Sequence, residues 1–161
     1  MIGGPEWPDH APTAWGLLID GAWAPAREGG RARATSPSSG ADLAELAMAG
    51  PADVDAAVAA GRRAAAEWAA SGAFARAAVL RRMADAVVAH AEVLTQALTA
   101  DQGKPLAEAR DETAELEVYL RMAAEDAVRL EGRLPPSIDP GRRILLQRVP
   151  LGVVAVIVPW N

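Results

Sequence analysis

The chain has 161 residues, of which 51% are hydrophobic and 23% charged; its formal net charge is -5, and it contains no cysteine. This composition is typical of one globular domain with a sizeable core rather than of a disordered chain. The arginines are dispersed among acidic residues, which argues against a nucleic-acid-binding face. The lack of cysteine excludes disulfides, thiolate metal sites and a cysteine nucleophile within this chain.

The sequence gives no signal for secretion or membrane insertion. Its first residues, through Asp9 and His10, lack the basic start and the apolar core of a signal peptide. The longest apolar run, residues 149–160, is shorter than the roughly 20 residues that a membrane helix needs. We therefore expect a cytoplasmic protein without a membrane partner.

Short strands are predicted in the N-terminal third. Residues 1–16 are rich in proline, glycine and tryptophan and are expected to form a flexible lead-in. The segment Leu17-Leu18-Ile19-Asp20-Gly21-Ala22-Trp23 predicts a hairpin, because Asp-Gly readily supplies the positive φ of a tight turn. Residues 29–40 are expected to form a loop, and residues 42–48 a short edge strand.

Three helices are predicted next, each from apolar residues that recur at helical spacing. The first begins at Pro51, with Asp53 near its positive end. The second covers about residues 73–102 and ends at Gly103-Lys104-Pro105, where glycine can cap the helix and proline can start the next one. The third covers about residues 105–131.

The C-terminal part is predicted to contain two strands. Residues 142–149 form the first, and the apolar run Leu151 to Val158 is typical of a strand buried on both faces, as in a parallel sheet. Such a strand needs neighbours that do not follow in this chain. The order of elements therefore predicts the entry into an α/β domain whose remaining strands are missing.

The candidate functional residues lie at the end of this last strand. Asn161 stands just beyond it, where open α/β sheets place their ligand chemistry, and its amide could donate to a developing oxyanion. Its position alone is explained more simply by a turn or strand cap. Trp160 could line a planar ligand or belong to the core. Pro159 fixes the exit from the strand, and the backbone of Ile157 and Val158 could accept a ligand lying across the sheet.

Other polar residues give no sign of a metal site or an acid–base pair. His10 and His90 lack the spacing of recognised metal ligands. The carboxylates between positions 108 and 117 are interpreted most simply as a solvated helix face.

Several segments, taken together, resemble the N-terminal part of the NAD(P)-dependent aldehyde dehydrogenase superfamily. The resemblance covers residues 17–161. It rests on segments in the family's order and spacing: Ile19-Asp20-Gly21-Ala22-Trp23, Ser36-Pro37-Ser38-Ser39-Gly40, Asp53 to Val58 with Trp68, Arg76 with Leu80 and Ala84-Asp85, Gln102-Gly103-Lys104-Pro105-Leu106 with Glu108-Ala109, Leu130-Glu131-Gly132, Pro150 to Val154 and, most specific, Pro159-Trp160-Asn161.

The resemblance implies a truncated α/β fold, made of an N-terminal helical part and the first strand of a Rossmann-type domain. After the lead-in, residues 17–141 would hold the hairpin and helices, residues 142–152 an oligomerisation-type strand, and residues 153–161 the first strand of the cofactor sheet. It further implies a homodimer or homotetramer when the protein is complete.

The resemblance also implies roles for the terminal residues. Asn161 would help to bind the oxyanion, while Ile157, Val158, Pro159 and Trp160 would line the NAD or NADP site. The cysteine nucleophile and the glutamate base would lie beyond Asn161, so the chain alone is expected to be inactive. A semialdehyde substrate is favoured slightly, and the choice between NAD and NADP stays open. The alternative is a non-catalytic helical interaction or oligomerisation module.

Overall fold

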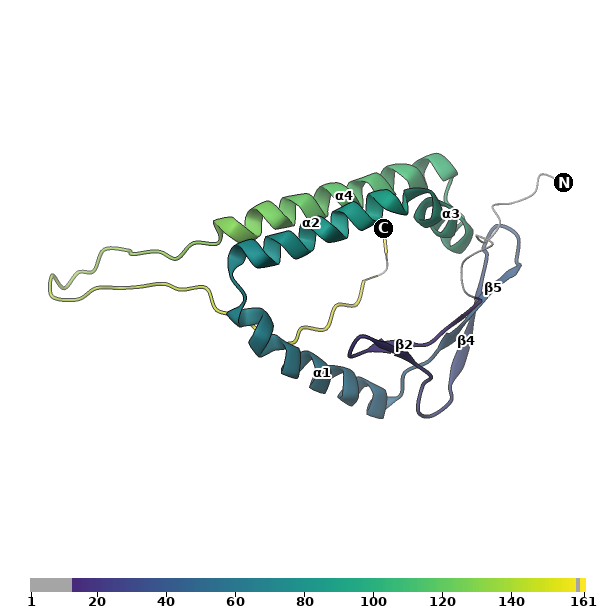
Figure 1. Cartoon of the computed structure of the whole chain (residues 1–161), viewed down its shortest axis with the longest axis horizontal. Coiled ribbons are helices and arrows are strands. Elements are labelled where there is room, and N and C mark those ends of the chain that lie inside the picture. Colours follow the sequence, from purple (N-terminus) through teal and green to yellow (C-terminus); the bar gives the residue numbers. More distant parts are fainter. Residues whose placement is uncertain (1–12, 159) are drawn as a thin grey trace.

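The structure, a computed structural model, describes residues 13–158 and 160–161. The described part is a mixed α/β architecture in which short strands precede long helices (Figure 1). The strands are β1 (Ala14–Trp15), β2 (Leu17–Ile19), β3 (Ala22–Ala24), β4 (Arg31–Thr35) and β5 (Asp42–Ala47), and the helices are α1 (Pro51–Ala70), α2 (Ala73–Ala89), α3 (Ala91–Gln102) and α4 (Leu106–Arg129).

The predicted hairpin is confirmed as the antiparallel pair β2–β3. Its turn places both Asp20 (φ 54°) and Gly21 (φ 76°) in the left-handed region, which is the geometry that matches the twist of a two-stranded ribbon. Trp23 then meets Trp15 edge to face, with ring centroids 5.6 Å apart. A Cβ on Gly16 would lie 2.6 Å from the carbonyl oxygen of Ala24, so only glycine fits between β1 and β2.

The other strands differ from the expectations. Residues 31–35, expected within a loop, form β4, and β5 is the centre of a sheet with the order β1-β5-β4 rather than an edge strand. The alternation Arg-Ala-Arg-Ala-Thr is a strand pattern whose arginines pair across to β5, through Arg31–Glu45 at 3.1 Å and Arg33–Asp42 at 3.0 Å. Ala14 and Trp15, expected in the flexible lead-in, form the parallel edge strand β1, whereas residues 1–12 lie outside the described part.

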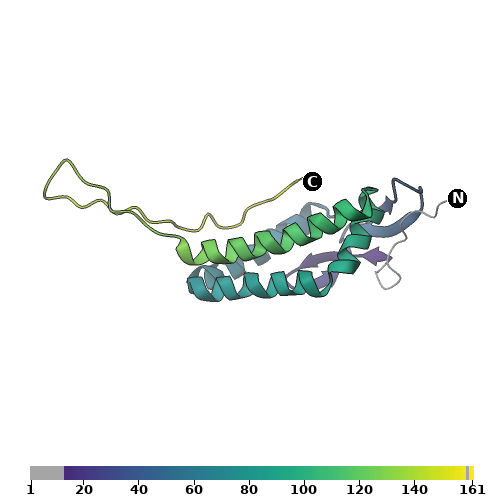
Figure 2. The same ribbon diagram turned by 90° about the horizontal axis from the view of Figure 1, so that it is seen from above.

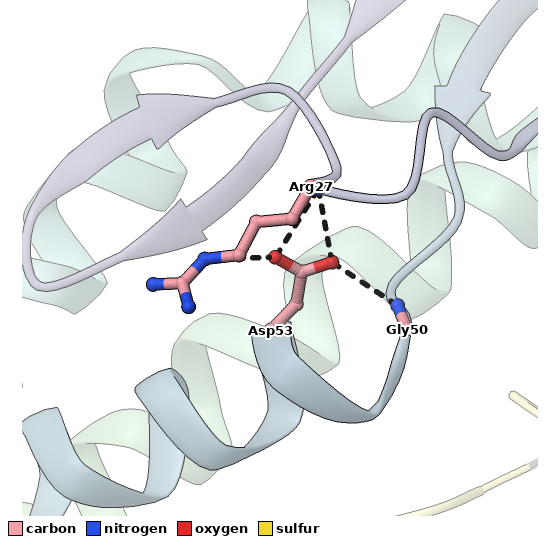
Figure 3. A network of polar contacts seen from close by, with 3 residues as sticks. All are labelled: Arg27, Gly50 and Asp53. Carbon is pink, nitrogen blue, oxygen red and sulfur yellow. Dashed lines mark hydrogen bonds and ion pairs between the residues drawn. The ribbon is translucent and has the colours of Figure 1, made fainter.

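The first helix begins at Pro51 as predicted, and its start is tied to the strand region by Asp53 (Figure 3). This carboxylate is only 3% exposed. It accepts hydrogen bonds from the backbone N–H of Gly50 at 3.1 Å and of Arg27 at 3.3 Å, and its second oxygen lies 3.6 Å from the Arg27 guanidinium. The buried charge thus has partners on both sides, and it satisfies backbone donors that the helix itself cannot.

The second predicted helix is in fact two helices, α2 and α3, which meet at His90 (φ -116°, ψ 17°). Apolar residues continue at helical spacing across this break, and no glycine or proline marks it, so the pattern could not reveal it. The end of α3 is as predicted: Gly103 has φ 74° and donates its N–H to the carbonyl of Thr99.

The helices α2 and α4 pack side by side along most of their length, and α3 packs against the start of α4 (Figures 1 and 2). Small residues allow the close approach, because Ala77, Ala84 and Ala124 are fully buried. Ion pairs follow the rim, with Arg121 bonded to Glu117 and Asp85. These two hydrogen bonds, that to Glu117 first, raise the pKa of Arg121 above its ordinary value.

The C-terminal segment does not form the two expected strands. Within residues 130–158 the structure shows only an isolated bridge between Arg133 and Leu146, at the base of a long excursion from the end of α4 (Figures 1 and 2). Ile157 is 95% exposed and Val156 77% exposed. A strand exists only where a second strand satisfies its backbone, and no described segment lies alongside residues 151–158 to do so.

Candidate functional site

A cavity of about 720 Å³ lies between the β1-β5-β4 sheet and the helices α3 and α4. The end of the chain reaches this cavity, with Trp160 and Asn161 in its lining. The rest of the lining comes from one face of the sheet and one face of each helix: Trp15, Ala34, Ala44, Leu46, Leu94, Ala97, Leu98, Asp101, Glu112, Thr113, Glu115, Leu116 and Tyr119.

Strand register explains the sheet wall. Ala44 and Leu46 are two apart in β5, so both side chains project from the same face. Ala34 stands opposite Ala44, and Trp15 stands opposite Leu46, which extends this apolar wall onto β4 and β1.

Helical spacing explains the opposite wall. On α3 the lining residues stand at 94, 97, 98 and 101, and on α4 they include 112, 115, 116 and 119. These intervals of three, four and seven place each set on a single helix face. The wall is fixed beneath by Thr113, which accepts a hydrogen bond from Thr95 at 3.3 Å and donates one to the carbonyl of Ala109 at 2.8 Å.

The polar groups in the lining are unevenly charged. Three carboxylates belong to it, and no lysine, arginine or histidine does among the described residues. Glu112 forms a partly buried ion pair with Lys104, whose side chain is 15% exposed. Neither Asp101 nor Glu115 has an ion pair in the part of the chain that the structure describes. The Asn161 carboxamide is the neutral hydrogen-bonding group at the tip of the chain.

The structure brings two of the five sequence-predicted site residues together at the cavity, namely Trp160 and Asn161. Trp160 has φ 72°, a left-handed conformation that is uncommon outside glycine. Ile157 and Val158 do not line the cavity and are exposed, so their cofactor role stays a prediction. Pro159, the remaining residue, lies outside the described part of the chain.

Sequence reasoning missed the helix wall. It interpreted the acidic residues of α4 as a solvated face, whereas Glu112 and Glu115 line the cavity. The available signal was the spacing of Glu112 and Glu115 with Leu116 and Tyr119, which mixes acidic and apolar residues on one side of the helix.

Two searches of the described residues gave negative results. They contain no group of three or more histidine, cysteine or acidic side chains placed to hold a metal ion. Their helices include none with the length and apolarity required to cross a bilayer.

Comparison with known proteins gives a consistent result. The family model described as "Aldehyde dehydrogenase family" matches residues 23–161. The chain is 37% identical over 144 residues to a 3-sulfolactaldehyde dehydrogenase of Pseudomonas putida, a match that covers 89% of this chain and 30% of that protein. It is 34% identical over 144 residues to an Escherichia coli succinate-semialdehyde dehydrogenase whose name specifies NADP(+), with the same coverage of both.

The fold agrees with these sequence matches. The crystal structure of an NAD-dependent aldehyde dehydrogenase from Sinorhizobium meliloti superposes with a TM-score of 0.77 at 29% identity, covering 87% of this chain and 29% of that one. The chain therefore spans about 30% of the length of the curated relatives that it matches.

Proposed function

The chain belongs to the aldehyde dehydrogenase family, and on that premise we propose that it is the N-terminal portion of an enzyme that oxidises an aldehyde to a carboxylate with NAD(P)+. The matched region runs to Asn161 and covers the same 30% of two relatives with different substrates, which supports a shared N-terminal portion. The first strand of a Rossmann-type sheet would then form from residues 153–158 once neighbouring strands are present.

The observation that carries this proposal is the place of Asn161 in the lining of the cavity. A carboxamide N–H held beside a reacting carbonyl stabilises the oxyanion that forms when a nucleophile attacks, typically by a factor of about 10²–10³ in rate. The cavity offers an apolar wall for the rest of the aldehyde through Leu98, Leu116 and Tyr119.

Other chemical groups must come from outside this chain. The chain contains no cysteine, so the thiolate that would attack the carbonyl is not among its residues. The glutamate that would activate water is likewise assigned to a further part of the enzyme. By itself the chain is expected to convert no aldehyde.

The residues present fit one side of a dinucleotide site. Ile157 and Val158 are exposed, so their backbone groups are accessible next to Trp160. When bound, NAD(P)+ supplies the hydride acceptor. Residues 157–160 would orient it from below, and the remaining contacts would come from elsewhere in the enzyme.

The second candidate function is a non-catalytic interaction or oligomerisation module, and the exposed apolar segment from Ile144 to Val158 favours it. The two candidates overlap, since a homodimer or homotetramer of the complete enzyme would also cover this segment. Catalysis separates them.

The test joins this chain to the remaining 70% of the E. coli relative, in place of that protein's own matching portion. Formation of reduced cofactor from a panel of aldehydes, with none from the 161-residue chain alone, is the expected result. A soluble, folded fusion that binds NADP+ but turns over no aldehyde would contradict the catalytic proposal and support the module.

A further inference from the structure

We propose that the cavity beside Asn161 accepts aldehydes with a neutral or cationic tail and repels those that carry a second anionic group. This inference rests on the proposed function and adds the substrate class. It differs from a simple transfer of the names of the relatives, whose substrates are a sulfonated aldehyde and succinate semialdehyde.

The first step is the charge of the cavity. Asp101 on α3 and Glu115 on α4 are both in its lining and both lack an ion pair within the described residues. The third carboxylate, Glu112, is neutralised by Lys104. The lining therefore carries two uncompensated negative charges and no positive one, so an anionic tail would meet only repulsion there.

The second step is the chemistry of the remaining wall. The sheet side contributes Trp15, Ala34 and Leu46, and the helices contribute Leu94, Leu98 and Leu116. A site built to hold a carboxylate or sulfonate would present an arginine or lysine to it, because these groups pair with oxyanions. This wall instead fits an alkyl or aryl chain, with room at the acidic residues for a positive group.

The third step is the position of the charges relative to the reacting end. Asn161 and Glu115 line the same cavity, so an aldehyde whose carbonyl faced Asn161 would extend its tail along α4. Glu115 stands one turn before Tyr119 on the same helix face. Its charge acts on the tail rather than on the carbonyl, which makes it a specificity residue and not a catalytic one.

The test uses the 161-residue chain and two probes of equal length and opposite charge, hexylammonium and hexanoate. Trp15 and Trp160 line the cavity, so tryptophan fluorescence reports occupancy, and ligand-observed NMR provides an independent reading. We expect hexylammonium to bind about tenfold more tightly than hexanoate at low salt, since each carboxylate contributes roughly a severalfold preference at this range.

Matched variants assign the preference to the cavity. Glu115→Gln should reduce the ratio of the two affinities severalfold, whereas Glu108→Gln should leave it unchanged. Glu108 lies on the same helix and is exposed, and it does not line the cavity. Equal binding of the two probes, binding of neither, or the same loss in both variants would overturn the inference.

The outcomes separate this inference from the proposed function. An active fusion enzyme with equal probe binding would leave the dehydrogenase proposal standing and remove only the charge preference. A charge preference in the chain together with an inactive fusion would do the reverse. In an active fusion, Glu115→Gln should also raise kcat/KM for succinate semialdehyde relative to an aminoaldehyde of the same length.

Discussion

The helix pair α2–α4 and the C-terminal segment of residues 147–158 are both rich in apolar residues, yet only the helix pair is packed. In the helices each backbone N–H finds its partner within the same element, and buried alanines such as Ala77 and Ala124 let the two axes approach. The segment has a similar apolar content but no described strand beside it, and Val156 is 77% exposed. The comparison shows that apolar character alone does not order a segment whose backbone partners must come from elsewhere.

Hydrogen exchange should show the largest contrast between the two regions. Amides in the middle of α2 and α4 are expected to exchange at least about 10³-fold more slowly than those of residues 147–158, because no backbone hydrogen bond among the described residues protects the latter. The measurement is exchange of the 161-residue chain followed by mass spectrometry or NMR. Equal protection would mean that the segment pairs with another strand in solution.

Overfilling the helix interface should have the next largest effect. Ala84→Leu adds volume where α2 has no free space, since Ala84 is fully buried, and is expected to lower the free energy of unfolding by about 1–3 kcal/mol. Ala86→Leu on the exposed side of the same helix is the control and should change it by less than about 0.5 kcal/mol. Urea unfolding followed by circular dichroism measures both, and similar losses in the two variants would count against the packed interface.

Removal of the Asp53 carboxylate should cost somewhat less. Asp53→Ala leaves the N–H groups of Gly50 and Arg27 without their acceptor and is expected to lower the free energy of unfolding by about 1–2 kcal/mol. Asp55→Ala changes an exposed carboxylate in the same turn and should have little effect. If both variants lose the same stability, the charge of the first turn matters and the hydrogen bonds do not.

A polar replacement in the C-terminal segment should have the smallest effect. Val156→Thr is expected to change the free energy of unfolding of the isolated chain by less than about 0.5 kcal/mol, whereas Val79→Thr in the half-buried face of α2 should cost more. The same pair in the fusion enzyme should reverse, because residues 153–158 would then lie within a sheet. A large loss for Val156→Thr in the isolated chain would show that this segment is already buried.

These regions also show what the sequence can predict. The Asp20-Gly21 turn, the start of α1 at Pro51 and its Asp53, and the Gly103 cap were all predicted because each depends on a few neighbouring residues. The strand β4 was missed because a short Arg-Ala alternation is easily interpreted as a polar loop, and its pairing with β5 is not local.

The candidate site follows the same rule. Asn161 and Trp160 were identified from the end of an apolar run and from a family resemblance. The wall that faces them comes from α3 and α4, more than forty positions earlier in the chain. Only the fold shows that Glu115 and Asn161 share a cavity, so the acidic lining could not be predicted from spacing along the chain.

The most direct test of the central claim is Asn161→Ala in the active fusion enzyme, by steady-state kinetics with separate titration of the cofactor. Loss of an oxyanion donor predicts a fall in kcat/KM of about 10²–10³ with unchanged cofactor affinity and melting temperature. Trp160→Ala, in contrast, should weaken cofactor binding and stability first. If Asn161→Ala keeps near-original kcat/KM at saturating cofactor, Asn161 only caps the end of the strand, and the catalytic role assigned to this chain is wrong.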